Sequence, residues 1–503
     1  MTDKDVMKGF VFHQPGTGQK ANCRLLEPNV SPTGDEDKTT HDLKSLFDRL
    51  PLKNGMTVSF HHHLRDGDGV MNMVMKELAG RGLSDLTLAA SAIFPVHAPL
   101  VSMIKDKTVT HIVTNYVNGP VGETLSDGCL SGGLVMDTHG GRARAIETGE
   151  LPIDIAFIAV SASDIHGNAN GVQGPSACGT LGYTIPDLRH AALRVLVTDT
   201  LLPSVAPIDI DGKYVDHVLV TPSIGDPKRI RSGTTKPTKD PIQQRIAHTT
   251  ARLIDALGLI KDGMTFQTGA GGVSLAVARD LKTIMQDRHI KGRYASGGIT
   301  AFLANMLEDG LFETLYDVQC FDGDAVRSYR ENARHVMMDA GQYASPCHSD
   351  AIARGLDVVV LGGSEVDLDF NVNVTTDSSN LLIGGSGGHA DTAAGAKVSI
   401  ITTSLLKGRI PTIKNRVTTI TTPGESVDII VTERGIAINP SRTDLLEQAK
   451  TLPFDVVPIE TLMERAHKMA GEPSTVSVKG EAIGVVRYSD GTVTDIIRKR
   501  VSF

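Results

Sequence analysis

The sequence predicts an α/β protein made of two duplicated domains, each a mostly parallel, doubly wound sheet, with a β-hairpin near the C-terminal end. Three observations support this fold class. The two halves of the 503-residue chain resemble each other, apolar runs alternate with amphipathic helical patterns within each half, and a proline- and glycine-rich segment separates the halves. A chain of this length also exceeds what one hydrophobic core usually supports.

The internal repeat rests on three matches that occur in the same order. The segment LKNGMTVSFHHHLRDGDGV, from Leu52, matches IKDGMTFQTGAGGV, from Ile260. The segment DIAFIAVSASDIHGNAN, which ends at Asn170, matches DVVVLGGSEVDLDFNVN, which ends at Asn373. Finally, VDHVLVT late in the first half matches VDIIVTE in the second. Matches at a nearly constant separation indicate an ancient duplication.

The boundary between the two domains is expected near residue 240. Residues 221–244 have the sequence TPSIGDPKRIRSGTTKPTKDPIQQ, which is typical of a linker. We therefore assign residues 1–240 to an N-terminal domain and residues 241–503 to a C-terminal domain. Within each, apolar runs such as DVVVLGG and KVSIITT alternate with helical patterns such as GGVSLAVARDLKTIMQ. This alternation predicts parallel sheets, which bind ligands beyond the carboxyl ends of their strands.

The last part of the chain follows a different pattern. In VVRYSDGTVTDIIRKR, Asp490 and Gly491 lie between two runs of alternating polarity. This arrangement predicts a type I′ hairpin that adds an antiparallel pair at a sheet edge.

Composition argues against several classes of protein. A net charge of −8 and a pI near 6.1 disfavour nucleic acid or an anionic membrane as the main partner. The N-terminal MTDKDVMKGF lacks an apolar signal segment, and no apolar run is long enough to span a membrane, so we expect a cytoplasmic location. The five cysteines include no Cys-x-x-Cys pair, so we expect neither a zinc site nor a disulfide framework.

Glu365 is the candidate catalytic residue. It follows an apolar strand and a Gly-Gly turn, and the repeat places Ala162 at the equivalent position of the first half. A glutamate at a strand end is more often a solvated charge or a capping group. Downstream, however, the run GGSGGHAD, residues 384–391, can either form a tight turn or present backbone N–H groups to an oxyanion or phosphate. A carboxylate beside such donors suits acyl transfer from a thioester.

These segments resemble the acyl-CoA hydrolase and CoA-transferase family. GGSEVDLDFNVNV, GGSGGHADTAAGAKVSIITT and VTTITTPGESVDIIVTERGIA are similar to its successive signature blocks, in which a glutamate lies opposite a glycine-rich oxyanion loop. MTFQTGAGGVSLAV is similar to the family's loop for a CoA-like substrate, and VSASDIHGNANG to its first-domain Ser-x-x-Asp-x-x-Gly segment. The resemblance spans both halves in order and implies two CoA-transferase-like domains.

The resemblance also assigns roles to individual residues. It implies that Glu365 is catalytic and that Gly387 and Gly388 form the oxyanion loop. The loop near the CoA-like arm would consist of Gly269, Gly271 and Gly272. The sequence departs from the family at Phe370, where relatives often have glycine, and at His389, where hydrolases have Gln or Asp. Whether Glu365 forms a glutamyl thioester or only positions the reacting groups stays open.

The segments FHHHLRDGDGV and SGGITAFLANMLEDG are most similar to one branch of this family. That branch implies a transferase that exchanges the acetyl group of an acetyl-S-carrier protein for citrate, giving citryl-S-carrier protein and acetate. The thiol would belong to a CoA-derived phosphoribosyl-dephospho-CoA group on a small gamma subunit, so the chain would need no cofactor of its own. A separate lyase beta subunit would then cleave the citryl thioester. The chain is thus expected to form a homo-oligomer within a hetero-oligomeric complex.

Three adjacent histidines and an arginine are candidates for binding citrate. His61, His62, His63 and Arg65 stand where the second half has its glycine loop. A metal site is not expected, because neighbouring strand residues point to opposite faces and three in a row cannot all bind one ion. An arginine fork with one or two imidazoles suits a tricarboxylate, and a solvated or core histidine cluster is the alternative.

Two further groups and two rival functions complete the expectations. Arg142 and Arg144 are expected on a loop as a solvated basic spot, with docking of an acidic carrier protein as the functional alternative. Cys347 and His348 are adjacent, but sequence neighbours rarely face each other as nucleophile and base.

The closest rival function is a free acyl-CoA:carboxylate CoA-transferase or an acyl-CoA hydrolase acting on a CoA thioester. The other is a non-catalytic scaffold that holds partner subunits together.

Overall fold

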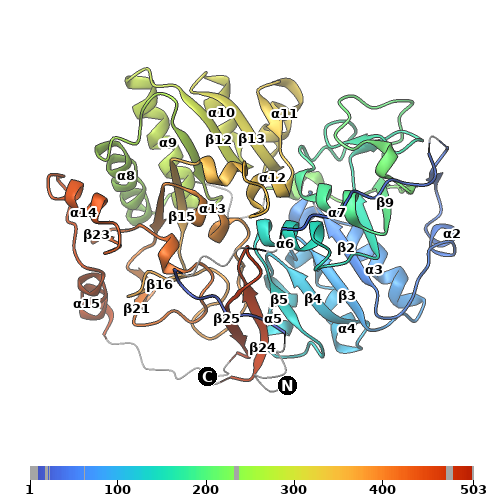
Figure 1. Cartoon of the computed structure of the whole chain (residues 1–503), viewed down its shortest axis with the longest axis horizontal. Coiled ribbons are helices and arrows are strands. Elements are labelled where there is room, and N and C mark those ends of the chain that lie inside the picture. Colours follow the sequence, from blue (N-terminus) through green and yellow to red (C-terminus); the bar gives the residue numbers. More distant parts are fainter. Residues whose placement is uncertain are drawn as a thin grey trace.

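The computed structural model contains two large, mostly parallel sheets, one from each half of the chain (Figure 1). It describes residues 9–16, 21, 23–34, 36–61, 63–231, 237–471 and 480–500. The candidate residue His62 therefore lies outside the described residues. Within this part of the chain, no helix is long and apolar enough to cross a membrane.

The first sheet has ten strands in the order β1-β10-β9-β6-β2-β3-β4-β5-β24-β25. Neighbouring strands are parallel from β1 through to β24. Those from the first half are β1 (Thr39–Thr40), β2 (Thr57–His61), β3 (Leu86–Ala90), β4 (Val109–Thr114), β5 (Leu134–Met136), β6 (Ile155–Ala159), β9 (Leu193–Thr198) and β10 (His217–Val220). The helices of this half are α2 (Leu43–Phe47), α3 (Val70–Gly80), α4 (Leu100–Lys105), α5 (Gly119–Ser126), α6 (His139–Glu147) and α7 (Ile185–His190).

The second sheet has eight strands in the order β14-β13-β12-β11-β15-β18-β22-β23, parallel except for the last pair. Its strands are β11 (Thr265–Thr268), β12 (Gly292–Ile299), β13 (Phe312–Cys320), β14 (His335–Met337), β15 (Val358–Gly362), β18 (Val398–Thr402), β22 (Ile429–Thr432) and β23 (Gly435–Ile438). The helices are α8 (Pro241–Ala256), α9 (Gly272–Asp287), α10 (Ala301–Glu308), α11 (Gly323–Glu331), α12 (Ala340–Ala344), α13 (His389–Gly395), α14 (Thr443–Ala449) and α15 (Ile459–Ala470).

The strand orders confirm the predicted fold and the internal repeat. The run β10-β9-β6-β2-β3-β4-β5 of the first sheet has the same connectivity as β22-β18-β15-β11-β12-β13-β14 of the second. Each half also carries a small antiparallel hairpin after its central strand. The hairpins are β7 (Ala162–Ser163) with β8 (Ala169–Asn170), and β16 (Glu365–Asp367) with β17 (Val372–Asn373). Central strands such as β6 are buried along their whole length, as expected for a sheet covered on both faces.

The C-terminal hairpin extends the sheet of the first half. Figure 1 shows β24 (Ala482–Arg487) and β25 (Val493–Arg498), in red, beside β5, with which β24 pairs in parallel. The predicted type I′ turn is wrong. Asp490 does not have the positive φ that this turn requires; the Gly491 N–H donates to the Tyr488 carbonyl (3.0 Å), and only Gly491 has a positive φ. This is a type I turn closed by a glycine bulge. The domain boundary near residue 240 stays a prediction.

A disulfide joins the N-terminal segment to the second half, contrary to the expectation from the cysteine pattern. It links Cys23 to Cys347, which are 324 residues apart in the sequence. Spacing rules read local patterns, so they could not have revealed a pair this distant.

Candidate functional site

Glu365 lies on β16, in the hairpin that follows the carboxyl end of β15, and only 3% of it is exposed. Its carboxylate accepts hydrogen bonds from Asn373 Nδ2 (3.0 Å), Ser378 Oγ (2.7 Å) and the Thr418 backbone N–H (2.8 Å). The Thr418 hydroxyl adds a further bond, and Lys414 Nζ forms an ion pair with the same carboxylate. The residue is therefore a buried carboxylate with a nearly complete shell of donors.

The surroundings of Glu365 keep it ionised. Burial by itself would raise the pKa of this carboxyl, but the charge of Lys414 and the hydrogen bonds outweigh burial, so the pKa lies below its ordinary value. Lys414 belongs to β21 (Ile413–Lys414), which pairs with β16, and its ammonium also donates to Ser378 Oγ (2.8 Å). A second cation, Lys407, lies nearby with its pKa lowered by burial. Nucleophilic attack by Glu365 would first require this ion pair to loosen.

The glycine run reaches the first half of the molecule. The Gly387 N–H donates to the Asn115 carbonyl (3.2 Å), and the Gly387 carbonyl accepts from the His139 N–H (2.9 Å). No described residue accepts a hydrogen bond from the Gly388 N–H. A side chain at Gly388 would collide with the hydroxyl of Tyr343. Of the two glycines assigned to the oxyanion loop, Gly388 is thus the one with an available N–H in this conformation.

His389 links the glycine run to the Glu365 hairpin. Its Nε2 bonds to the carbonyl of Gly362, at the end of β15, and its Nδ1 bonds to Thr422 Oγ1 (3.0 and 2.7 Å). Burial lowers the pKa of His389 to about 4, so the ring is neutral. The carboxylate of Glu365 itself bonds to residues 373–378 and 414–418, not to the glycine run. His389 therefore ties the glycine run to the end of β15, just before Glu365, while the Glu365 carboxylate has no hydrogen bond to the glycine run among the described residues.

His61 is held by a buried carboxylate through one ring nitrogen, and its other nitrogen, Nδ1, has no partner among the described residues. It ends β2, is buried, and its Nε2 bonds to Asp187 Oδ2 (2.8 Å). Arg142 grips the same carboxylate with both terminal nitrogens (3.0 and 3.1 Å). Burial lowers the pKa of His61 more than Asp187 raises it. The expectation of a solvated basic spot is wrong: Arg142 and Arg144 lie on α6 and are both buried, the latter bonded to Glu150 (2.6 Å).

His63 and Arg65 face the second half. Neither ring nitrogen of His63 has a partner among the described residues, and burial lowers its pKa to about 3. The Arg65 guanidinium lies 4.2 Å from the centre of the Phe321 ring and 5.6 Å from that of Phe94. Burial lowers its pKa to about 10, so it stays charged at neutral pH. Gln319 Nε2 donates to the His63 carbonyl across the boundary between the halves (3.4 Å).

Sequence reasoning missed the residues that complete this region. His139 begins α6, and its ring lies 4.4 Å from Tyr183 and 6.5 Å from Tyr343, measured between ring centres. Burial lowers its pKa to about 3, and its Nδ1 has no partner in the described part of the chain. Asp391 accepts from the Gly140 N–H (2.9 Å), and burial raises its pKa to about 7. The sequence signal for this close contact between the halves is the pair Gly140-Gly141, directly after His139.

We call His63, Arg65, His139 and Tyr183 the junction cluster. Tyr183 contacts His139 and interacts electrostatically with Arg65, and His63 precedes Arg65 by two positions in the chain. Neutral imidazoles, a charged guanidinium and a phenol offer donors for a carboxylate-rich ligand.

The second predicted loop has room for a ligand. Gly269 and Gly271 lie between β11 and α9, and Gly272 is the first residue of that helix. A Cβ built on Gly271 would meet nothing within 4 Å, so packing does not explain the glycine. No side chain caps the N-terminus of α9. Free backbone N–H groups at a helix start suit amide or phosphate oxygens of a CoA-like arm.

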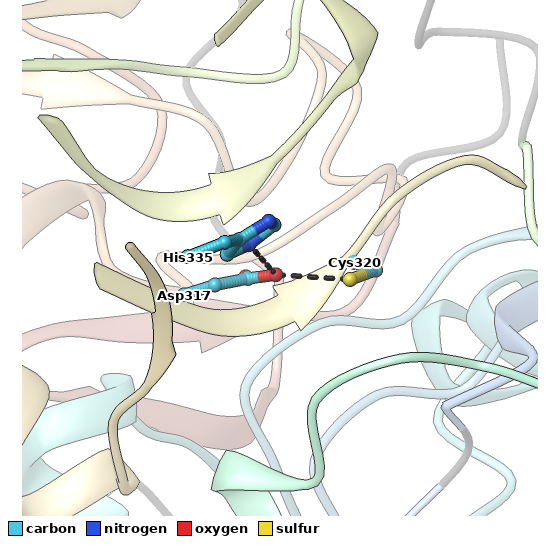
Figure 2. Close-up of side chains that lie close together, drawn as sticks. All are labelled: Asp317, Cys320 and His335. Carbon is cyan, nitrogen blue, oxygen red and sulfur yellow. Dashed lines mark hydrogen bonds and ion pairs between the residues drawn. The ribbon is translucent and has the colours of Figure 1, made fainter. Parts of the chain in front are cut away.

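A separate cluster, Asp317, Cys320 and His335, lies on β13 and β14 (Figure 2). Figure 2 shows His335 Nε2 and Cys320 Sγ both directed at one oxygen of Asp317. Each of these atoms lies 3.0 Å from that oxygen. These residue types bind metal ions and their ligand atoms lie within 4.8 Å of one another. All three are buried, however, and Asp317 already satisfies both donors, while burial raises the pKa of Cys320 well above its ordinary value. The cluster is accounted for as a buried hydrogen-bond network.

Comparison with known proteins identifies the family. A family model described as citrate lyase, alpha subunit, matches residues 36–500. The chain belongs to the citrate lyase alpha subunit family. It is 43% identical to the citrate lyase alpha chain of Klebsiella pneumoniae, over 92% of this chain and 91% of that one. It is also 43% identical to the citrate lyase alpha chain of Escherichia coli K12, over 96% of both.

Solved structures agree with this family assignment. The crystal structure of the putative alpha subunit of citrate lyase from Streptococcus mutans, in complex with citrate, superposes with a TM-score of 0.91 at 42% identity and covers 95% of each chain. A malonate decarboxylase alpha subunit from Acinetobacter baumannii matches with a TM-score of 0.64 at 15% identity, covering 88% of this chain and 86% of that one. The latter match shows a shared fold alone.

Proposed function

We propose that the chain exchanges the acetyl group of an acetyl-S-carrier protein for citrate, giving citryl-S-carrier protein and acetate. The observation that carries the proposal is Glu365, a buried, ionised carboxylate at the carboxyl edge of one sheet, where the repeat has Ala162. Family membership and the citrate complex of the Streptococcus mutans relative support citrate as the acceptor. Arg65 and His63 of the junction cluster are the groups we assign to the citrate carboxylates.

Two balanced routes lead to this exchange. In the direct route, a citrate carboxylate attacks the acetyl thioester carbonyl, the C–S bond breaks, and an acetyl–citryl anhydride and a thiolate result. The thiolate then attacks the citryl carbonyl and releases acetate. The Gly388 N–H is the donor we assign to the developing oxyanion. Here Glu365 keeps its donors and orders Ser378, Thr418 and Lys414 around the site.

In the covalent route, Glu365 replaces citrate as the first nucleophile. Its carboxylate forms an anhydride with the acetyl group, and the released thiolate attacks the glutamyl carbonyl to give a glutamyl thioester and acetate. Citrate then displaces the glutamyl group by the same two steps in reverse. The saturated shell of Glu365 favours the direct route, since a carboxylate held by Lys414 is a weakened nucleophile.

The thioester arm fits the open loop before α9. The open position at Gly271 and the uncapped start of α9 support binding of a CoA-derived phosphoribosyl-dephospho-CoA arm there, whereas the Gly269 N–H is used by the Val360 carbonyl (2.9 Å). This arm would be carried by a gamma subunit, so we expect the chain to need no cofactor of its own. We place the chain in the cytoplasm, as a homo-oligomer within a complex that also contains a lyase beta subunit for citryl cleavage.

The test combines kinetics with chemical trapping. Acetate release from acetylated carrier protein on adding citrate should be lost in Glu365→Gln. Borohydride reduces a glutamyl thioester to an alcohol, which peptide mass spectrometry would detect at Glu365 in the wild type only if the covalent route operates. Loss of exchange without trapping supports the direct route. Full activity of Glu365→Gln in an assembled complex would contradict the role and favour the scaffold function.

A free acyl-CoA transferase or hydrolase is the alternative reaction. Comparing acetyl-CoA with the acetylated carrier protein as donor separates the two. Equal or better use of acetyl-CoA would contradict the carrier-protein proposal.

A further inference from the structure

A basic groove lies on the outer edge of the second half. It has a volume of about 750 Å³ and is formed by α8, the turn between β22 and β23, and α15. Six cationic or titratable basic side chains line it: Arg245, His248, Arg252, Arg434, Arg465 and Lys468. We refer to it as the basic groove.

The positive charge of the basic groove is largely uncompensated. Its five arginine and lysine side chains outnumber the two carboxylates that also line it, Asp455, which is paired with Arg465 (2.6 Å), and Glu433, which accepts the Leu405 N–H (3.0 Å) and keeps its negative charge. In the described ranges of the chain, no carboxylate pairs with Arg245, Arg252, Arg434 or Lys468, and all four are exposed. Such a concentration of one sign is unusual for a protein of net charge −8 and favours a negatively charged partner.

The helix α8, which forms one wall of the groove, begins next to the loop assigned to the thioester arm. Helix α8 begins at Pro241, capped by Asp240, whose side chain accepts the Gln243 N–H (3.0 Å). Just before it, the Thr238 N–H donates to the Gly272 carbonyl at the start of α9 (3.1 Å). Gln244, next to Arg245, donates to the Thr238 carbonyl (3.2 Å). The first turn of α8 therefore adjoins the open glycine loop.

The groove also adjoins the edge of the sheet at which the reaction is placed. Thr432, which lines the groove, is the last residue of β22, and Glu433 and Arg434 follow it. The strands β11, β15 and β18 end at this same edge because they are parallel to β22. A partner seated in the groove would thus lie beside the carboxyl ends of the strands that lead to the arm loop and to Glu365.

We propose that the basic groove docks an acidic face of the carrier protein, whose thioester arm then enters over Gly269, Gly271 and Gly272. This rests on the proposed function. Charge complementarity mainly accelerates association and fixes orientation, so exposed cations suit a partner that must bind, react and leave. The exposed position of these side chains fits a protein surface better than a small anion, which would call for buried donors.

The test reverses charge in the groove and at a matched control. Arg252→Glu/Arg434→Glu and Lys76→Glu/Lys105→Glu change the net charge equally, and the control lysines are exposed on α3 and α4 of the first half. Binding of the acetylated carrier protein to the full chain is measured by calorimetry at two salt concentrations. We expect the groove variant to weaken binding about tenfold or more and to lose much of its salt dependence. Unchanged binding in the groove variant, or equal loss in the control, would overturn the proposal.

Two further measurements separate docking of the protein face from binding of the prosthetic group and from a loss of activity. Carrier protein without its prosthetic group should show the same loss; a loss seen only with the arm attached would mean that the groove binds the arm, which overturns docking of the protein face. Acetate release from acetylpantetheine should be equal in the groove variant and the wild type. If the wild type binds the carrier in a charge-dependent manner but does not exchange acetate for citrate, the proposed function fails while the groove assignment stands.

Discussion

The two small hairpins that follow the central strands share a scaffold and differ at one position that matters. In the first, Asp164 accepts from the Asn168 N–H (3.0 Å) and from its side-chain amide (2.9 Å). In the second, Asp367 accepts from the same two groups of Asn371 (2.9 and 3.2 Å). The two turns have the same structure because in each a buried aspartate accepts its hydrogen bonds from an asparagine four residues later. This local requirement accounts for the sequence pattern that both halves share.

The two hairpins differ at the residue that pairs with the last asparagine of each hairpin, Asn170 or Asn373. Asn170 pairs with Ala162 and uses its amide on Gln173 and Pro207. Its equivalent, Asn373, pairs with Glu365 and donates to that carboxylate. The hairpin itself is therefore a structural element that both halves share. The chemistry comes from adding one carboxylate and the long-range donors that hold it.

The largest effect is expected from removing that carboxylate. Glu365→Gln keeps the shape but removes the negative charge that orders Lys414, and we expect acetate–citrate exchange to fall about a thousandfold or more, as for other groups central to a reaction. The measurement is acetate release at saturating citrate. Glu313→Gln, an exposed glutamate on β13, is the control and should be unaffected. A fall of less than tenfold in Glu365→Gln would contradict the conclusion that Glu365 makes the second hairpin functionally different from the first.

The equivalent asparagines should separate stability from activity. Asn170→Ala and Asn373→Ala each remove several buried hydrogen bonds, and we expect each to lower the free energy of unfolding by about 1–3 kcal/mol. Only Asn373→Ala should also reduce exchange, because only Asn373 bonds to Glu365. Denaturant unfolding and acetate release are measured on both variants. Equal loss of exchange in the two would show that the hairpins do not differ in function.

Replacing Lys414 should change the pH dependence. In the wild type the pKa of Glu365 is lowered, so the stability of its ion pair is complete above the unfolded-state pKa and is lost as pH falls through the folded-state pKa. In Lys414→Met, burial then dominates and raises the pKa of Glu365, so the acidic limb of kcat/KM for exchange should move to higher pH. Lys397→Met, whose partner Asp357 lies elsewhere, is the control. An unmoved limb would mean that Glu365 ionisation does not limit the reaction.

The smallest effect is expected from the disulfide, which lies outside both hairpins. Cys347→Ser should leave exchange unchanged and increase proteolysis of residues 23–34. The segment keeps other contacts, such as the bonds from the Leu26 N–H to Glu147 and from the Asn29 N–H to Arg189. Limited proteolysis and acetate release measure the two effects. A large loss of exchange would show that this link, and not the hairpins, controls the site.

The sequence by itself determined the repeat, the mostly parallel, doubly wound character of the two sheets and the position of Glu365 at a strand end. These are local properties: strand periodicity, turn chemistry and the match between halves are contained in short segments. The family resemblance, which spans both halves, also follows from such segments.

Only the tertiary structure decided what surrounds those residues. Lys414 and Thr418 lie 49 and 53 positions from Glu365. Asp187, which bonds to both Arg142 and His61, lies 45 and 126 positions from them. The Cys23–Cys347 link and the basic groove likewise join segments distant in sequence. Local patterns fix the backbone, but whether a charged side chain is buried, paired or free depends on which distant segment folds against it.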